Sequence, residues 1–547
     1  MKLKYLLSCS IILLSIFNVG CKKFLEETPY SFVATDNFYK TATDAELALT
    51  GVYDVLNAST IQGEGGSSTW GRGMQFLTSM GCDELITDAT KITSDNNFVT
   101  IANYTYTSEN TILRSSWFFL YAGITRANFI IERVPDIAMN ETRKKQILAE
   151  AHFLRGMYYA YLGWLFGGVP VVNSTNVNLN QERSTLKEVM LQAESDFKVA
   201  YQDLPNRNPK LGRVNKYTAA GFLVKLYVYL ASCKENNVGE ALNFPLNSFS
   251  WVDKDKFYAE ALTICQDIYT QSGYSLIPSF NYLFLSATEE TARNEQMMLV
   301  QAGAGGNNEY IYYFNLAGPT GNYLTVGGTA GWMRPMREAY TRFNVNDSRR
   351  NLSFSGNIAA AATSQVINGR KYFTPTTVSA SLSNICLNKW REDDPVDRAA
   401  RGIPANSGET DYGILRYGDV LLMYAECKYK TGDEPGARAL LKEVRTRGNT
   451  PANLNTITTA YFKANFMDEL IDERSRELLG EGWRRFDLIR FGKLKDVVAA
   501  LNTSITFPTV NVAAVKDNFK DYKIWYPIPR RELDTNKELI PNPGYTN

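Results

Sequence analysis

Apolar residues recur at helical spacing along most of this chain, and two long stretches without that spacing separate the helical runs. Between Trp117 and Ile131 the apolar positions fall at i, i+3, i+4 and i+7, which places them on one helix face. The same spacing runs from Ile147 to Leu165, and Gly167-Gly168-Val169-Pro170 ends that helix. These patterns predict a mostly α-helical fold.

Further helical runs come in neighbouring pairs joined by short links. Thr43 with Glu46, and Thr185 with Glu188, have the spacing of capping boxes at which helices begin. Paired helices with short links predict αα-hairpins packed side by side. No clean 34-residue repeat is present, so periodicity alone does not establish a helical-repeat solenoid. The other predicted helices span about 215–232, 255–271, 414–430, 434–447, 461–480 and 484–500.

Two segments interrupt the helices and are rich in Gly, Asn, Thr and aromatic residues. We call 58–111 the first insertion and 272–411 the second insertion. Loops longer than about 15 residues are uncommon in compact domains and usually carry function. The insertions, rather than the helices, are therefore predicted to form the working surface.

The N-terminal residues 1–20 have the layout of a secretory signal. Lys2 and Lys4 precede an apolar run that is shorter than the roughly 20 residues of a membrane-spanning helix. Gly20-Cys21 follows and resembles the lipobox of bacterial lipoproteins, in which the cysteine thiol is acylated. We expect lipidation of Cys21, with residues 21–42 as a tether leading into a single domain over 43–547. An ordinary secreted protein with an incidental Cys21 is the alternative.

Charge and residue counts exclude several classes of function. The 58 Lys and Arg residues nearly balance the 57 Asp and Glu residues, so no basic footprint for nucleic acid is present. His152 is the only histidine and lies within a helical run, where a packed histidine is expected. The cysteines beyond Cys21 form no C-x-x-C pair and are expected to be mostly small buried residues. The sequence predicts no metal site and no cofactor.

Six motifs in chain order resemble the SusD/RagB family of outer-membrane nutrient-binding lipoproteins, from about Cys21 to Tyr545. Singly they are weak, but all six in order are specific. They are Trp117, Tyr121, Ile124 and Arg126-Ala127-Asn128; Glu150-Ala151, Phe153-Leu154-Arg155 and Phe166-Gly167-Gly168-Val169-Pro170; Gly212-Arg213-Val214 with Ala219-Ala220; Leu415-Arg416-Tyr417, Asp419-Val420-Leu421-Leu422 and Tyr424-Ala425-Glu426; Val444-Arg445, Glu473-Arg474, Glu477-Leu478, Glu481-Gly482, Arg484 and Asp487-Leu488; and Tyr526-Pro527-Ile528-Pro529 with Asn542-Pro543-Gly544-Tyr545.

The resemblance implies tetratricopeptide-like helix pairs in one body, with ligand-binding loops on one side. It also implies a surface-exposed lipoprotein of the outer membrane that caps a SusC-like TonB-dependent β-barrel transporter. Such a protein captures an oligosaccharide, or in some members a peptide, and passes it to the barrel without catalysis.

The aromatic residues of the insertions are the candidates for sugar contact. A sugar ring stacks its C–H face on Trp or Tyr, while its hydroxyls need Asn, Asp, Arg or Gln nearby. If residues from both insertions converge over the helical body, they form one ligand surface. Packing of these aromatics onto the body is the alternative for each of them. The candidates are Trp70, Arg72 and Asp83 of the first insertion and Tyr310, Tyr312 and Trp332 of the second.

Two rival functions remain to be weighed. Paired carboxylates such as Glu473 and Glu477 would suit a surface glycoside hydrolase, which needs two acids about 5–10 Å apart. Arginines crowd the same segment, which favours ion pairs and opposes a raised acid pKa. Buried Arg155, Arg416 and Arg474 need acceptors, and Glu426, Glu473 and Glu477 are the expected partners. A scaffold whose helix pairs hold protein partners is the third possibility.

Overall fold

The computed structural model describes residues 38–57, 60–61, 64–65, 69–88, 90, 95–207, 212–302, 331–357, 364–374, 376–390, 400–402, 409–504 and 510–545. The predicted signal, Cys21 and most of the predicted tether lie outside these residues. Their boundaries stay predictions.

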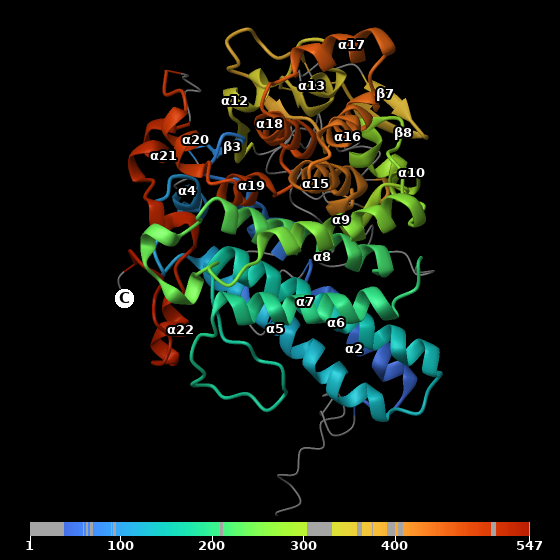
Figure 1. Ribbon diagram of the computed structural model, residues 1–547, viewed down its shortest axis with the longest axis vertical. Helices are drawn as coiled ribbons and strands as arrows, with labels where there is room; N and C mark the ends of the chain where they lie inside the picture. The colour runs from blue at the N-terminus through green and yellow to red at the C-terminus, as the bar shows by residue number, and fades with distance from the viewer. Residues whose placement is uncertain are drawn as a thin grey trace, which may run out of the picture.

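A ladder of helices, most of them packed on the next helix along the chain, forms the body of the molecule (Figure 1). The packing of neighbours in chain order confirms the mostly helical fold built from helix pairs. The C-terminal helices, drawn in red, run along the left side of this ladder in Figure 1. The ladder helices are α2 (Ala42–Asp54), α5 (Thr111–Arg133), α6 (Glu141–Phe166), α7 (Leu186–Asp203), α8 (Lys216–Glu235), α9 (Lys254–Gln271), α15 (Tyr417–Lys430), α16 (Glu434–Thr446), α17 (Pro451–Ala460) and α18 (Phe466–Leu478), followed by α19 (Arg484–Arg490), α20 (Leu494–Ala500), α21 (Val512–Asn518) and α22 (Arg530–Thr535).

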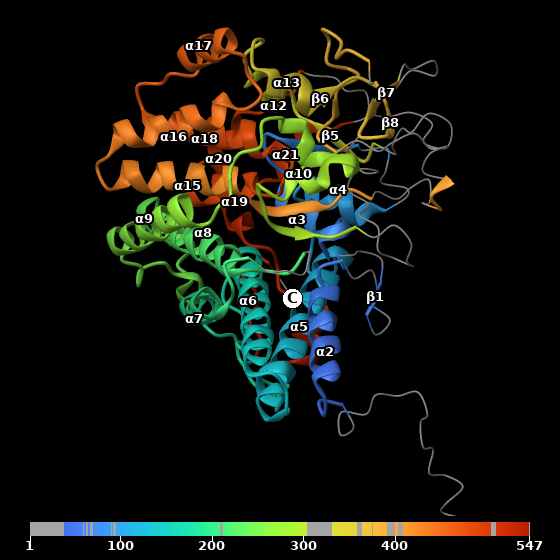
Figure 2. The same cartoon turned by 90° about the vertical axis from the view of Figure 1, so that its right-hand side faces the viewer.

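The second insertion leaves the ladder between two helices that pack directly on each other. Helix α9 ends at Gln271 and α15 begins at Tyr417, yet the two are neighbours in the ladder. The insertion is therefore an excursion from a ladder that continues behind it. In Figure 2, α8, α9, α15 and α16 lie on one side, and the short helices and strands of the insertion lie toward the other.

Only short elements form within the described parts of the insertions. Their strands pair two by two in antiparallel fashion: β1 with β2, β3 with β5, β4 with β10, β6 with β9 and β7 with β8. The helices are α3 (Met74–Ser79), α4 (Asn96–Ala102), α10 (Glu289–Ala292), α12 (Arg337–Thr341) and α13 (Ser348–Ser353); the strands are β1 (Thr60–Ile61), β2 (Glu64–Gly65), β3 (Leu85–Thr87), β4 (Gln296–Val300), β5 (Met333–Pro335), β6 (Phe354–Ser355), β7 (Ser364–Ile367), β8 (Arg370–Phe373), β9 (Cys386–Leu387) and β10 (Tyr412–Arg416).

Some predicted helix boundaries differ from the observed ones. The first capping box is formed by Thr41 and Asp44, not by Thr43 and Glu46, because the Thr41 hydroxyl accepts from the Asp44 amide. The box of Thr185 and Glu188 is confirmed. The run predicted over 484–500 is two helices, since the chain turns at Gly492 with a φ of 65°.

Glycine lets the two long helices α5 and α6 approach closely. A Cβ atom at Gly123 would lie 2.3 Å from the Tyr158 ring, so only glycine fits there. At the end of α6, Gly167 has a φ of 81°, which glycine adopts without strain. The Asn247 side chain fills the space beside it and accepts from the Gly168 amide at 2.8 Å.

Polar residues on buried helix faces are paired, as the sequence predicts. The Nδ1 atom of His152 on α6 lies 2.6 Å from an Asp196 carboxylate oxygen, and Arg155 donates to both oxygens of Asp196. His152 is thus a packed helix histidine. The five described cysteines are buried and form no disulfide with one another, which confirms the prediction that they are mostly small buried residues: Cys82, Cys233, Cys265, Cys386 and Cys427.

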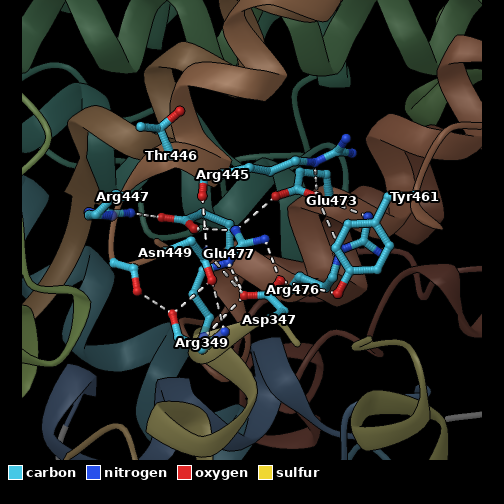
Figure 3. Close-up of polar contacts among 12 residues, drawn as sticks. Asp347, Arg349, Arg445, Thr446, Arg447, Asn449, Tyr461, Glu473, Arg476 and Glu477 are labelled. Carbon is cyan, nitrogen blue, oxygen red and sulfur yellow. Dashed lines mark hydrogen bonds and ion pairs between the residues drawn. The ribbon is translucent and has the colours of Figure 1, made fainter. Parts of the chain in front are cut away.

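A buried cluster of carboxylates and arginines joins the second insertion to α18 (Figure 3). Glu473 accepts from Arg349 of α13 at 2.8 Å and from Arg445 of α16 at 2.9 Å. Glu477, one turn further along α18, accepts from Arg349 at 2.9 Å and from Arg416 at 2.7 Å. Glu473, Glu477 and Arg349 are each fully buried, so the ion pairs are shielded from water. We call this group of five residues the α18 cluster.

The buried arginines pair with carboxylates, as predicted, but only some of these carboxylates are the predicted residues. Arg416 pairs with Glu477 as predicted. Arg155 instead uses Asp196, and Arg474 uses Asp419 and Asp487. The predicted partner Glu426 binds Arg490.

The first insertion is bound to the pair of helices α18 and α19, which we call the α18–α19 hairpin. Asp83 accepts two hydrogen bonds from Arg484 of α19, at 2.8 and 2.7 Å, and pairs with Arg342 of the second insertion. The neighbouring Glu84 accepts from the Ser475 hydroxyl at 2.9 Å and from the Gly480 amide at 3.2 Å. Both insertions therefore rest on the α18–α19 hairpin.

Among the described helices, none combines the length and the apolar character that crossing a bilayer requires. Within the same residues, no three His, Cys, Asp or Glu side chains gather closely enough to hold a metal ion.

Removing one charge from the α18 cluster should destabilise the fold strongly. We expect Glu473→Gln to lower the free energy of unfolding by about 3–5 kcal/mol, because it leaves buried arginines without their counter-charge. Urea titration measures the change. The matched control is Asp521→Asn, since Asp521 pairs with Lys495 at the surface and both side chains are more than half exposed. The importance of the cluster is contradicted if the two variants have equal stability.

Glu84 should make the fold less stable as the pH rises through neutrality. Burial raises the pKa of its carboxyl to about 7, against the opposing charge of Arg484. Between about pH 4.5 and 7 the folded chain keeps a proton that the unfolded chain has lost, so unfolding becomes easier with rising pH. We expect Glu84→Gln to remove at most about 3 kcal/mol of this pH dependence, because one pKa unit corresponds to about 1.4 kcal/mol. Urea titrations of the wild type and of Glu84→Gln at pH 5 and pH 8 measure this change. If both proteins lose the same unfolding free energy between these pH values, Glu84 is not the cause.

Candidate ligand-binding site

The two insertions meet through the strand pair β3–β5. Leu85, Ile86 and Thr87 of the first insertion face Pro335, Arg334 and Met333 of the second. The pairing continues beyond the strands, where the Asp88 amide donates to the Trp332 carbonyl oxygen at 2.9 Å. The prediction that two segments far apart in sequence converge is thereby confirmed.

Beside this strand pair lies a group of aromatic and charged residues that we call the Trp332 surface: Arg72, Asp88, Asp95, Trp332 and Arg334. The Trp332 ring is half-buried and packs edge-to-face on Phe98 of α4, with ring centroids 5.7 Å apart. The Arg72 guanidinium lies 4.4 Å from the centre of the same Phe98 ring. Phe98 is fully buried, so it supports Trp332 and Arg72 from below.

Two acid–arginine pairs flank Trp332. An Arg72 nitrogen lies 3.8 Å from an Asp95 oxygen, and an Arg334 nitrogen lies 4.0 Å from an Asp88 oxygen. These separations are longer than direct hydrogen bonds. The same groups also have other contacts, since Asp95 accepts from Asn97, Asp88 accepts from Thr90 and Arg334 donates to the Cys386 sulfur. A partly exposed aromatic ring between such groups is chemically suited to a ring with an apolar face and hydroxyl groups at its edge.

Trp70 is not part of this surface. Its place in a glycine-rich loop predicts an exposed ring, but the side chain is only 2% exposed. It lies in the π-helical turn Thr69–Gly73 and packs edge-on against Tyr161 of α6, with centroids 4.9 Å apart. The prediction that Trp70 presents its ring to a ligand is wrong, because the ring is part of the helical core.

Asp83 is also buried, which corrects its predicted place in the ligand surface. Its side chain is 3% exposed and both of its oxygens are used by Arg484. Burial alone raises the pKa of Asp83, but the charges of Arg484 and Arg342 overcome this and hold the pKa below its usual range. Asp83 anchors the first insertion instead.

The remaining predicted site residues have different outcomes. Arg72 and Trp332 both contact the Phe98 ring, and their roles in ligand binding stay predictions. Tyr310 and Tyr312, like Cys21, lie outside the residues that the structure describes, and their roles stay predictions.

Sequence analysis missed Phe98, Asp88 and Asp95. Phe98 lies on α4, within a stretch predicted to lack helices. The signal that locates this helix is Asp95, whose carboxylate caps it by accepting from the Asn97 amide at 3.1 Å. No comparable local signal marks Asp88, because its position depends on the pairing of β3 with β5.

The carboxylates considered for glycoside hydrolysis have unsuitable surroundings. Burial by itself raises the pKa of Glu477, but Arg447, Arg416 and Arg349 together lower it to about 2. Arg349, Arg445 and Arg476 likewise outweigh burial and hold the pKa of Glu473 below its usual range. A general acid needs the opposite shift and access to substrate. In this structure both carboxylates are ionised, fully buried and occupied by arginines.

Two family sequence models match successive parts of the chain. The model described as "SusD family" matches residues 295–545, and the one described as "Starch-binding associating with outer membrane" matches residues 23–228.

Curated relatives extend over nearly the whole chain at low identity. SusD-like protein P25 of Formosa agariphila is 25% identical over 100% of this chain and 99% of its own length. Starch-binding protein SusD of Bacteroides thetaiotaomicron is 23% identical, with 86% of each chain covered.

Solved structures share the fold. A laminarin binding SusD-like protein aligns with a TM-score of 0.68 at 22% identity, covering 93% of this chain and 100% of that one. Surface glycan-binding protein A from Bacteroides thetaiotaomicron, solved in complex with laminarihexaose, has a TM-score of 0.69 at 18% identity and covers 92% and 100%. At these identities the likeness establishes the helical fold. Since models of one family account for both the N-terminal and the C-terminal part of the chain, and relatives match it along its whole length, the chain belongs to the SusD-like family.

Proposed function

We propose that this chain is a cell-surface lipoprotein that binds oligosaccharide at the Trp332 surface and passes it to a TonB-dependent β-barrel transporter. The observation that carries the proposal is the convergence of the two insertions, which places a partly exposed tryptophan between two acid–arginine pairs. Membership of the SusD-like family and the laminarihexaose bound by a solved neighbour support glycan as the ligand.

The chemistry of capture follows from the residues at the surface. A sugar ring stacks its C–H face on the Trp332 ring, and its hydroxyls bond the carboxylate of Asp95 and the guanidinium groups of Arg72 and Arg334. Phe98 and the β3–β5 pair hold these groups in place before ligand arrives, so little ordering accompanies binding. The role is non-catalytic, which is in keeping with the ion-paired state of Glu473 and Glu477.

Replacing the tryptophan tests the ligand surface. We expect Trp332→Ala to weaken binding of an oligosaccharide selected on a glycan array at least tenfold, about 1.4 kcal/mol, because the stacking face is lost. Isothermal titration calorimetry measures the affinity, and urea titration should show nearly unchanged stability. Trp70→Ala is the matched control, since it removes a buried ring and should lower the free energy of unfolding by about 3–5 kcal/mol. Unchanged affinity in a folded Trp332→Ala protein would place the site elsewhere.

Membrane attachment and delivery are tested through Cys21. We expect wild-type protein to carry acyl chains at residue 21 by intact mass, and to co-purify from native membranes with a β-barrel transporter. Cys21→Ser should be found in the soluble fraction and still bind oligosaccharide with wild-type affinity, because the ligand surface lies on the folded body. An unmodified residue 21, or membranes in which no barrel accompanies the protein, would refute this part of the proposal.

A further inference from the structure

A polar cavity lies in the second insertion, and Trp332 is not among the residues that line it. It has a volume of about 530 Å³, within the roughly 300–1,000 Å³ typical of small-molecule sites. Helices α12 and α13 and strands β6 and β7 contribute to its wall, and all four are labelled in the upper part of Figure 2. Tyr340, Arg350, Asn351, Ser355, Thr377 and Asn388 are among the residues that line it.

The wall of this cavity combines aromatic rings with neutral hydrogen-bonding groups. Tyr340 packs edge-to-face on the buried Phe354, with ring centroids 5.3 Å apart, which forms an aromatic side. The rest of the described lining is mainly amides and hydroxyls, and no Asp or Glu is among it. Such a wall suits a polyhydroxylated ring and disfavours a metal cation, which would need carboxylates.

Unused hydrogen-bonding atoms are buried in the same wall. Ser355 is 6% exposed and Asn388 is 9% exposed. Within the described part of the chain, the Ser355 hydroxyl and the Asn388 side-chain oxygen have no hydrogen-bond partner. These two atoms add unused hydrogen-bonding capacity to the cavity wall.

Arg350 gives the cavity its charge. Its neighbour Arg349 turns into the α18 cluster and pairs with Asp347, Glu473 and Glu477. Arg350 lines the cavity instead, with its guanidinium 5.2 Å from the centre of the Tyr340 ring. No ion pair joins Arg350 to any carboxylate of the described residues, although arginines elsewhere in this region are paired. An arginine held in this way is a ready partner for an anion.

We propose that this cavity is a second glycan-binding site and that it takes an acidic sugar unit, with Arg350 binding the anionic group. The sugar ring lies against Tyr340, and its hydroxyls bond the amides and hydroxyls of the wall, including Ser355 and Asn388. Carboxylate of a uronic acid and sulfate ester share the required chemistry. The proposal does not depend on the Trp332 surface, because the two sites have no residue in common.

Calorimetry with three oligosaccharides of equal length tests the assignment: one of uronic acids, one sulfated and one neutral. We expect the wild-type protein to bind at least one acidic oligosaccharide at this cavity, with affinity that falls as salt rises. Arg350→Gln should weaken that binding at least tenfold, and Asn351→Ala, which alters an exposed wall residue, should weaken it to a smaller extent. The acidic oligosaccharide that binds tells carboxylate from sulfate.

Two control variants show whether a loss of binding arises at this cavity. Arg337→Gln removes the same charge from an exposed arginine of α12 that is not among the lining residues, and should leave binding unchanged. Trp332→Ala should weaken binding at the Trp332 surface but keep the Arg350-dependent binding of the acidic oligosaccharide, which distinguishes failure of this proposal from failure of the Trp332 surface. The proposal is overturned if neither acidic oligosaccharide binds, if Arg350→Gln binds like wild type, or if it weakens neutral and acidic ligands equally.

Discussion

Glu473 and Glu477 lie one helical turn apart on α18, and arginines from three other segments pair with one or both of them. Arg349 comes from the second insertion, Arg445 from α16 and Arg416 from the end of β10. Each carboxylate is removed from water, which is unfavourable unless several charged donors replace the lost hydration. The energy of this cluster therefore depends on all of these segments being in place together. The cluster therefore favours one packing of the insertion over others. A packing that separates the charges leaves them buried and unpaired, which is unfavourable.

This dependence reaches the binding face through a short chain of contacts. The α18–α19 hairpin holds the first insertion through Asp83 and Glu84, and Arg342 of the second insertion joins the same carboxylate. With both insertions fixed at their bases, strands β3 and β5 can pair, and that pairing sets the position of Trp332 over Phe98. A few buried charges thus give order to segments that have little secondary structure of their own.

Helical periodicity is enough to predict the ladder, since apolar spacing and capping residues are local signals. It also locates the insertions, because their lack of periodicity is itself visible. It does not separate Trp70 from Trp332, although both are tryptophans in glycine-rich loops. Trp70 is buried because Tyr158 and Tyr161 of α6 lie against it, and no local sequence pattern predicts such neighbours. The prediction for Asp83 fails for the same reason, since its partners are hundreds of residues away in sequence. The predicted identity of the family rests on motifs whose glycines and arginines prove to serve packing and ion pairing.

The direct packing of α9 on α15 has a consequence for how such a protein can change over evolutionary time. The two ends of the second insertion leave the ladder side by side. The packing of α9 on α15 therefore does not depend on the length of the insertion between them. The entropy of closing a loop rises only slowly with its length, by about 0.6 kcal/mol for each doubling. Natural selection can therefore exchange, lengthen or shorten the recognition segments at small cost in stability, provided that the buried charges at their base remain. Related proteins can therefore evolve to bind new ligands while they keep the same helical ladder.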